Sequence, residues 1–309
     1  MIVRTPPVRR PIITWSAEMN VIHTSALTNA SRPSYLIPLI PVTLLFLWYW
    51  CTYYSLIYRE TGLDVKYDNL ANIQHLPIVN RFALLRQWLE MCDSKHHCFQ
   101  RELEASPTRV IFVGSTSHKL QLQLSTNQRH PVEYIALSHC WGKQSPEEKE
   151  RFCTTPKNYN ERLKGFSYHS LPKVFQDAIT VARELKKQYL WIDALCIIQG
   201  NLQDWEKEGK KMETVFASAY CTIAPSSASH WNEGFLERPQ VLSQSEGNTS
   251  TRKQSDDFRE LVDEGPLNSR AWVLQERALS RRTIFFTTKQ TYWECGMGVR
   301  CENFTTLKW

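Results

Sequence analysis

The heptapeptide ALSHCWG at 136–142 places a serine, a histidine and a cysteine next to one another. Such residues act as a nucleophile and its base only when their side chains lie within hydrogen-bond reach. The apolar residues before them predict an extended strand, in which consecutive side chains point to opposite faces of the sheet. Ser138, His139 and Cys140 therefore do not form a catalytic pair by adjacency. The pattern favours a strand end that leads into a binding loop over a self-contained nucleophile.

A second group of reactive side chains occupies residues 92–98. Its members belong to residue types that bind zinc: Cys92, His96, His97 and Cys98. No second pair at a recognised spacing follows soon after, so a zinc site would need distant residues such as His139 or Cys140 to complete four ligands. The spacing favours surface histidines and unpaired thiols, and we predict no metal.

Two carboxylates stand in positions that allow either a structural or a functional role. Asp193 lies within the apolar run 189–198, where an ionised carboxylate is costly unless paired. We interpret it as a hydrogen-bonded structural group, with a site residue as the alternative. Glu208 lies near the start of a predicted helix, three residues after Trp205, where the helix macrodipole stabilises acids. The functional alternative is a carboxylate that takes a proton or stabilises a developing cation.

An arginine-rich segment, SRAWVLQERALSRR at 269–282, reads as a polar and aromatic helix. Arg277 has the planar guanidinium group that binds anions. A salt bridge from Arg277 to Glu276 or Glu208 is the interpretation that we favour.

The segments that must position these residues alternate along the chain. Apolar strands are predicted at 133–140, 189–198 and 221–227, with amphipathic helices between them. This alternation indicates an α/β fold with a mostly parallel sheet flanked by helices. In open parallel sheets, ligands bind beyond the carboxyl ends of the strands. This rule identifies three places where a ligand could bind, the loops at 138–142, 199–208 and 225–229.

Other segments extend the predicted domain on both sides. A helix is predicted at 78–91, followed by a hairpin built from 108–114 and 119–125, and two further strands follow residue 282. We divide the chain into four parts. These are a disordered N-terminus (1–33), an apolar segment (34–58), an N-terminal extension (59–130) and a main domain (131–300) that contains a polar loop at 240–268.

Composition narrows the classes of function. The chain has 309 residues and a net charge of +6 from 37 basic and 31 acidic residues, so no dedicated nucleic-acid surface is expected. The odd count of 9 cysteines, several of them in apolar runs, favours a reducing compartment such as the cytoplasm. The uncharged segment 34–58 is long enough to cross a bilayer. It is a transmembrane anchor, a buried apolar segment or the product of an incorrectly assigned gene start.

Five ordered blocks of the sequence resemble the fungal heterokaryon incompatibility (HET) domain. They are EYIALSHCWG, LPKVFQDAI, YLWIDALCIIQ, DWEKEGKKM with VFASAYCTIA, and RAWVLQERALSRR followed by YWEC. The resemblance covers about residues 134–295. It implies a role in fungal non-self recognition, in which incompatible fusion partners trigger cell death.

The HET domain is in turn similar to Toll/interleukin-receptor (TIR) domains, which have a flavodoxin-like fold and in several lineages cleave NAD. This resemblance implies that Glu208 is catalytic and that Ser138, Trp141, Gly142 and Trp205 line a nucleotide cleft. The TIR pattern has three residues between its tryptophan and glutamate, whereas Trp205 and Glu208 are separated by two. Both spacings place the pair on one helical face.

Two functions follow from the resemblance. The first is a non-enzymatic assembly module that forms a homo-oligomer or recruits other death-signalling proteins. The second is NAD hydrolysis through Glu208, with NAD as a substrate and no resident cofactor. No glycine-rich phosphate fingerprint is present, which favours the assembly module.

Overall fold

The computed structural model describes residues 78–96, 98, 106–115, 118–127, 131–238, 257–303 and 306–307. The predicted disordered N-terminus (1–33) and the apolar segment 34–58 lie outside these residues. Within the described ranges, no helix has both the length and the apolar character of a membrane span. The predicted membrane anchor therefore stays a prediction.

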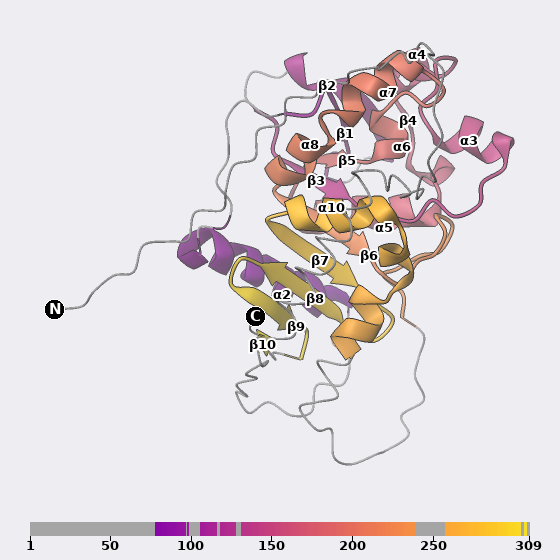
Figure 1. Ribbon diagram of the computed structural model, residues 1–309. Coiled ribbons are helices and arrows are strands. Elements are labelled where there is room, and N and C mark those ends of the chain that lie inside the picture. The colour runs from indigo at the N-terminus through magenta and orange to yellow at the C-terminus, as the bar shows by residue number, and fades with distance from the viewer. Residues whose placement is uncertain are drawn as a thin grey trace, which may run out of the picture. The chain divides into compact units, whose positions relative to one another are not determined.

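A single sheet of ten strands forms the centre of the described structure, in the order β10-β9-β8-β7-β6-β3-β5-β1-β2-β4 (Figure 1). The strands are β1 (Arg109–Phe112), β2 (Lys119–Leu124), β3 (Tyr134–Leu137), β4 (Phe166–Ser167), β5 (Tyr189–Trp191), β6 (Cys221–Pro225), β7 (Arg282–Phe286), β8 (Thr291–Cys295), β9 (Gly298–Cys301) and β10 (Thr306–Leu307). The predicted α/β class is confirmed.

The four central strands, β5, β3, β6 and β7, are parallel. Every residue of β3, β6 and β7 is buried, as expected for strands that helices cover on both faces. In chain order the four run 2-1-3-4, which is the order of the first four strands of a flavodoxin-like sheet. The predicted parallel arrangement thus holds for the centre of the sheet.

The prediction of a mostly parallel sheet is wrong for both margins, where the strands pair in antiparallel fashion. The physical reason is the length of the connections. Only Gly296 and Met297 separate β8 from β9, and a parallel connection needs a dozen or more residues. The hairpin predicted from 108–114 and 119–125 is confirmed as β1 and β2.

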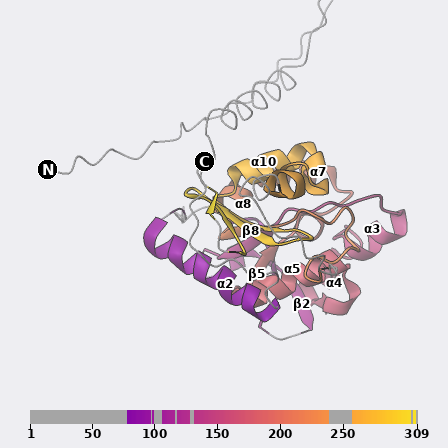
Figure 2. The same ribbon diagram turned by 90° about the horizontal axis from the view of Figure 1, so that it is seen from below.

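The main helices cover both faces of the sheet. They are α2 (Ile78–Met91), α5 (Lys173–Glu184), α7 (Leu202–Gly209), α8 (Met212–Ser218) and α10 (Ala271–Leu279). Shorter helices are α3 (Pro146–Phe152), α4 (Tyr159–Lys164) and α6 (Asp193–Cys196). Because the chain reverses direction across the sheet after β5, right-handed crossovers place α5 on one face and α8 and α10 on the other. Figure 2 shows this arrangement, with α2 on the same face as α5.

Two predicted segments differ from the structure. The strand predicted at 189–198 ends at Trp191, and α6 follows it directly. The predicted polar loop at 240–268 contains the single turns η4 (Arg259–Asp263) and η5 (Pro266–Ser269). These turns are ordered by apolar side chains that bury themselves against the sheet: Phe258, Val262 and Leu267. Residues 239–256 of that loop lie outside the described residues.

The segment predicted as an N-terminal extension is part of the same sheet. Strand β1 pairs with β5, and α2 packs against β8. The predicted apolar face of α2, formed by Phe82, Leu85 and Leu89, is buried in the core. This confirms the amphipathic helix predicted at 78–91.

A buried arginine joins this added strand to helix α7. The guanidinium of Arg109, in β1, donates to the Cys196 carbonyl at 2.6 Å and to the Asp204 carboxylate at 2.5 Å. The side chains of Arg109 and Asp204 are only 5% and 12% exposed. Strand β1 thereby holds α7 at the carboxyl edge of the parallel strands.

We predict that Arg109→Met lowers the free energy of unfolding by about 3 kcal/mol, because it leaves a largely buried carboxylate without its cation. The matched control is Arg86→Met, since Arg86 forms an exposed ion pair with Glu184. That substitution should cost less than about 1 kcal/mol. Urea denaturation measures both, and equal losses would contradict the assignment of Arg109 as a buried anchor.

Candidate functional site

The loop after β3 begins at the carboxyl edge of the parallel strands. The Ser138 amide continues the sheet by donating to the Ile223 carbonyl at 2.9 Å, and the chain then turns at Gly142. Gly142 has φ = +71°, and a Cβ at this position would overlap the His230 imidazole. Both observations require glycine at this turn.

Ser138 and Glu276 form the most buried polar pair at this edge. The Ser138 hydroxyl donates to the Glu276 carboxylate, and the two residues are 3% and 6% exposed. Burial raises the pKa of Glu276 to about 7 against the effect of the Ser138 hydrogen bond, and Asp193 raises it further. Glu276 can therefore exchange a proton near neutral pH, as a general acid or base does.

Asp193 has the partners expected of a hydrogen-bonded structural carboxylate. It accepts from Trp141 Nε1 at 2.9 Å and from the Ala194 amide at 2.7 Å. His139 Nδ1 lies 3.8 Å from Asp193 Oδ1, the oxygen that accepts from the Ala194 amide. Burial lowers the pKa of His139 to about 4, so the ring is neutral at pH 7. Within the described residues, neither ring nitrogen of His139 has a hydrogen-bond partner.

Ser138, His139 and Cys140 point to three different surroundings. His139 packs edge-on against Phe175, with ring centroids 5.0 Å apart, while the Cys140 thiol donates to the Pro266 carbonyl at 3.5 Å. Burial raises the pKa of Cys140, which opposes thiolate formation. The predicted divergence of these three side chains is thus confirmed.

Glu208 lies at the same carboxyl edge as Gly142, although its carboxylate is already bonded. The residue is 4% exposed, and its Oε1 accepts from Thr108 Oγ1 at 2.8 Å. Lys211 Nζ lies 3.8 Å away. Thr108 directly precedes β1, which runs antiparallel to β5, and this places Glu208 beside the carboxyl end of β5. The indole of Trp205, one turn earlier, is 54% exposed.

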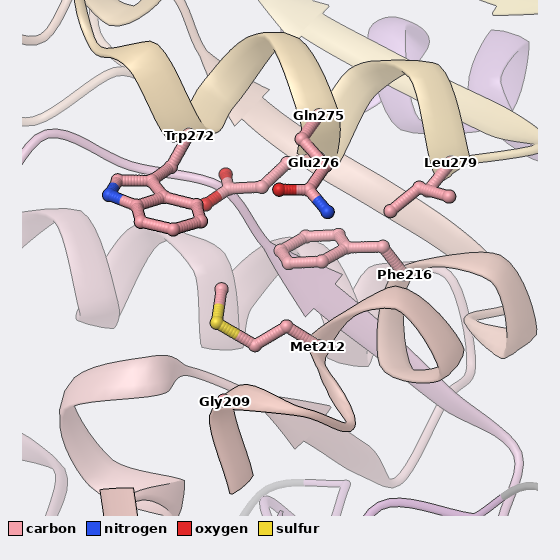
Figure 3. Close-up of a pocket in the computed structure, with 7 residues that line it drawn as sticks. All are labelled: Gly209, Met212, Phe216, Trp272, Gln275, Glu276 and Leu279. Atoms are coloured by element: carbon pink, nitrogen blue, oxygen red, sulfur yellow. The ribbon is translucent and has the colours of Figure 1, made fainter. Parts of the chain in front are cut away.

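A small pocket with a cavity volume of about 40 Å³ opens between α8 and α10 at this edge (Figure 3). Its lining residues are Gly209, Met212, Phe216, Trp272, Gln275, Glu276 and Leu279. Figure 3 shows Trp272 and Met212 on opposite sides of the pocket, with the Glu276 carboxylate near the indole. Glu276 is its one charged lining residue.

The pocket includes none of the five predicted site residues. Ser138 reaches it only through the hydrogen bond to Glu276, and Glu208 only through its neighbour Gly209. Trp141 instead stacks on Trp231 at 5.9 Å between ring centroids.

Glu276 was missed by sequence reasoning as a pocket residue. Its local signal is the i,i+4 spacing of Trp272 and Glu276, which aligns them on one face of α10. The same spacing aligns Met212 and Phe216 on α8. Spacing alone does not show that these two faces meet.

The predicted salt bridge of Arg277 to Glu276 or Glu208 is wrong. Arg277 pairs with Glu294 at 2.9 Å and with Asp263 at 2.6 Å. These acids lie in β8 and η4, so the arginine ties α10 to the sheet margin and is not directed at an anionic ligand.

Comparison with known families gives a match to part of the chain. Residues 134–276 match the family model described as Heterokaryon incompatibility protein (HET). The match confirms the predicted resemblance to the HET domain over this region. Neither the curated proteins nor the solved structures contain a significant match to the chain.

We predict that Glu276→Gln raises the free energy of unfolding, relative to wild type, more at pH 8 than at pH 4.5. The wild-type pKa rises from an ordinary value of 4.5 to about 7 in the folded state. Folding therefore retains a proton that the unfolded chain releases, and stability from this group falls as pH rises from about 4.5 to about 7. The neutral amide removes this loss, which is on the order of 3 kcal/mol at most.

Urea denaturation of the wild type and the variant at each pH measures the difference directly. Wild type and variant must be compared at the same pH because His139 also titrates. Its pKa is lowered from 6.5 to about 4 in the folded state, so the stability that it contributes is lost as pH falls from 6.5 to about 4. Glu213→Gln, at an exposed position of α8, is the matched control. A stability difference between Glu276→Gln and wild type that does not change with pH would rule out the titration of Glu276.

Proposed function

We propose that the HET domain of this chain is an assembly module in fungal non-self recognition and cell-death signalling. The match of residues 134–276 to the HET family model supports the biological setting. The observation that carries the biochemical role is an exposed apolar surface at the carboxyl edge of the sheet. We call it the rim surface, and its members are Leu202, Trp205, Met212 and Trp272.

The rim surface exposes large side chains around the pocket. Leu202, Trp205 and Trp272 are 71%, 54% and 60% exposed. Leu202, Trp205 and Gly209 recur at i, i+3 and i+7 and so share one face of α7. Because Gly209 lines the pocket beside Met212 and Trp272, this face of α7 borders the pocket. Clustered exposed indoles are typical of protein–protein interfaces.

The occupant that we propose is the rim surface of a second copy. In a two-fold pair the same patch meets itself, so that a protrusion can enter a hollow of the partner and the reverse. The rim surface offers both features, since Trp205 protrudes beside the pocket between α8 and α10. Trp205 of one copy then packs against the pocket of the other.

The chemistry of the pocket favours this occupant over a dinucleotide. Drug-sized ligands occupy pockets of about 300–1,000 Å³, whereas this one has a cavity volume of only about 40 Å³. Its one charged lining residue is Glu276, which would repel the phosphates of NAD when ionised.

Sedimentation of the full chain over a concentration series tests the assembly. We expect reversible self-association that Trp205→Ala weakens by about 30-fold, equivalent to about 2 kcal/mol for an interface tryptophan. Trp272→Ala should weaken it similarly. Met297→Ala is the control, because Met297 is 59% exposed but lies in the β8–β9 turn.

Circular dichroism melts establish that the variants stay folded. A chain that remains monomeric, or associates equally well in all three variants, would refute the rim surface as the interface. The second outcome would locate association elsewhere in the chain.

The second candidate function is NAD hydrolysis through Glu208, supported by the position of Glu208 and Gly142 at one edge of the sheet. The hard step is departure of nicotinamide with positive charge growing on the ribose, which a carboxylate stabilises. For this role, the Glu208 carboxylate must give up its hydrogen bond from Thr108 and contact the substrate instead. Nicotinamide release by the assembled full chain measures the activity, which Glu208→Ala should abolish and Glu213→Ala should leave intact. Absence of turnover by assembled wild type would eliminate this candidate.

A further inference from the structure

Three thiols and one imidazole converge on a point far from the rim surface. They are Cys92 and His96 at the two ends of η1 (Cys92–His96), Cys98, and Cys295 at the end of β8. Their ligand atoms all lie within 4.8 Å of one another. His96 Nδ1 and Cys295 Sγ are 3.6 Å apart.

The fold supplies the ligand that the local spacing lacks. The segment 92–98 contains only half of a zinc motif. His139 and Cys140 do not complete it, because both residues lie at the carboxyl edge of β3. Cys295 arrives instead from β8, 199 residues after His96. The packing of α2 against β8 brings the two segments together.

The separations fit a tetrahedral site. Zinc bonds of about 2.3 Å to sulfur and about 2.0–2.1 Å to nitrogen give tetrahedral edges of about 3.8 Å between two sulfurs and about 3.6 Å between sulfur and nitrogen. The observed 3.6 Å from His96 to Cys295 equals the second value. The widest pair, within 4.8 Å, needs a contraction of about 1 Å, which side-chain rotation provides.

The donor set selects the metal class. Thiolates with one imidazole suit zinc, whereas magnesium and calcium prefer oxygen ligands. Four protein ligands leave no open position, as in structural and not catalytic zinc sites. Cys92 and Cys295 are buried and the other two ligands are partly buried, so most of the site is shielded from water. The four protein ligands would therefore fill the coordination sphere of the zinc ion, with no place for water or substrate.

The surroundings hold and balance such a site. Within η1, Asp93 accepts from Tyr220 at 2.7 Å and from the Arg282 guanidinium at 2.5 Å. Three thiolates and neutral histidine around Zn²⁺ carry a net charge of −1, and Arg282 is the cross-strand neighbour of Cys295. A π-helical turn such as η1 is rare and frequently marks a functional site.

We propose that Cys92, His96, Cys98 and Cys295 bind one structural zinc ion. This ion fastens the end of α2 and the residues that follow it to β8 at the margin of the sheet. Binding converts the three thiols to thiolates and releases their protons to solvent. The zinc is a cross-link between residues far apart in the chain and is independent of the assembly function.

Metal analysis of the full chain, purified in reducing buffer without chelators, tests the site. We expect about one zinc ion per chain. Cys295→Ala and His96→Ala should lose it. Cys196→Ala is the matched control, because Cys196 is also a buried free thiol but lies in α6, and this variant should keep its zinc.

Cobalt reconstitution keeps the test decisive if the alanine variants fail to fold. Wild type loaded with Co²⁺ should show the intense ligand-field bands of a tetrahedral ion and thiolate charge-transfer absorption. His96→Cys should keep the metal and strengthen the charge-transfer band, and a chelator should lower the Tm of wild type. Wild type without zinc and without a tetrahedral cobalt spectrum would overturn the proposal. So would a Cys92–Cys295 disulfide in freshly isolated protein.

Discussion

Burial of the parallel strands on both faces is the constraint on which the rest of the structure depends. Strands β3, β6 and β7 have no exposed face, so their polar groups must find partners inside or emerge at the strand ends. The helices that connect parallel strands impose this burial. Ser138 leaves β3 and Asp193 follows β5 at the carboxyl edge of the sheet, where both side chains find polar partners.

The polar groups at this edge are held mostly in neutral or paired form. His139 is kept neutral by burial, Glu276 retains a proton up to about pH 7, and Glu208 is bonded to Thr108. Such an edge presents little charge to an anionic ligand while it exposes the indoles of Trp205 and Trp272. This combination suits association between proteins, in which desolvated aromatic side chains contribute most of the binding energy.

The antiparallel strands at the two margins of the sheet hold helices in place. At one margin, β1 joins β5 and anchors α7 through Arg109. At the other, β8 supports α2 and carries Cys295 toward Cys92. Strands before and after the HET region thus belong to the same sheet as that region. The strands β1 and β2, which precede it, therefore have a structural role in the domain.

The sequence by itself determined the features that depend on local periodicity. Helix α2, the β1–β2 hairpin, the parallel centre and the divergence of Ser138, His139 and Cys140 follow from patterns a few residues long. Tertiary structure alone decided the partners: Glu276 for Ser138 across 138 residues, Glu294 for Arg277, and Cys295 beside His96. It also decided the antiparallel margins and the helical turns within the predicted polar loop. Contacts between distant segments depend on how whole layers pack, and this leaves no local signal in the order of the residues.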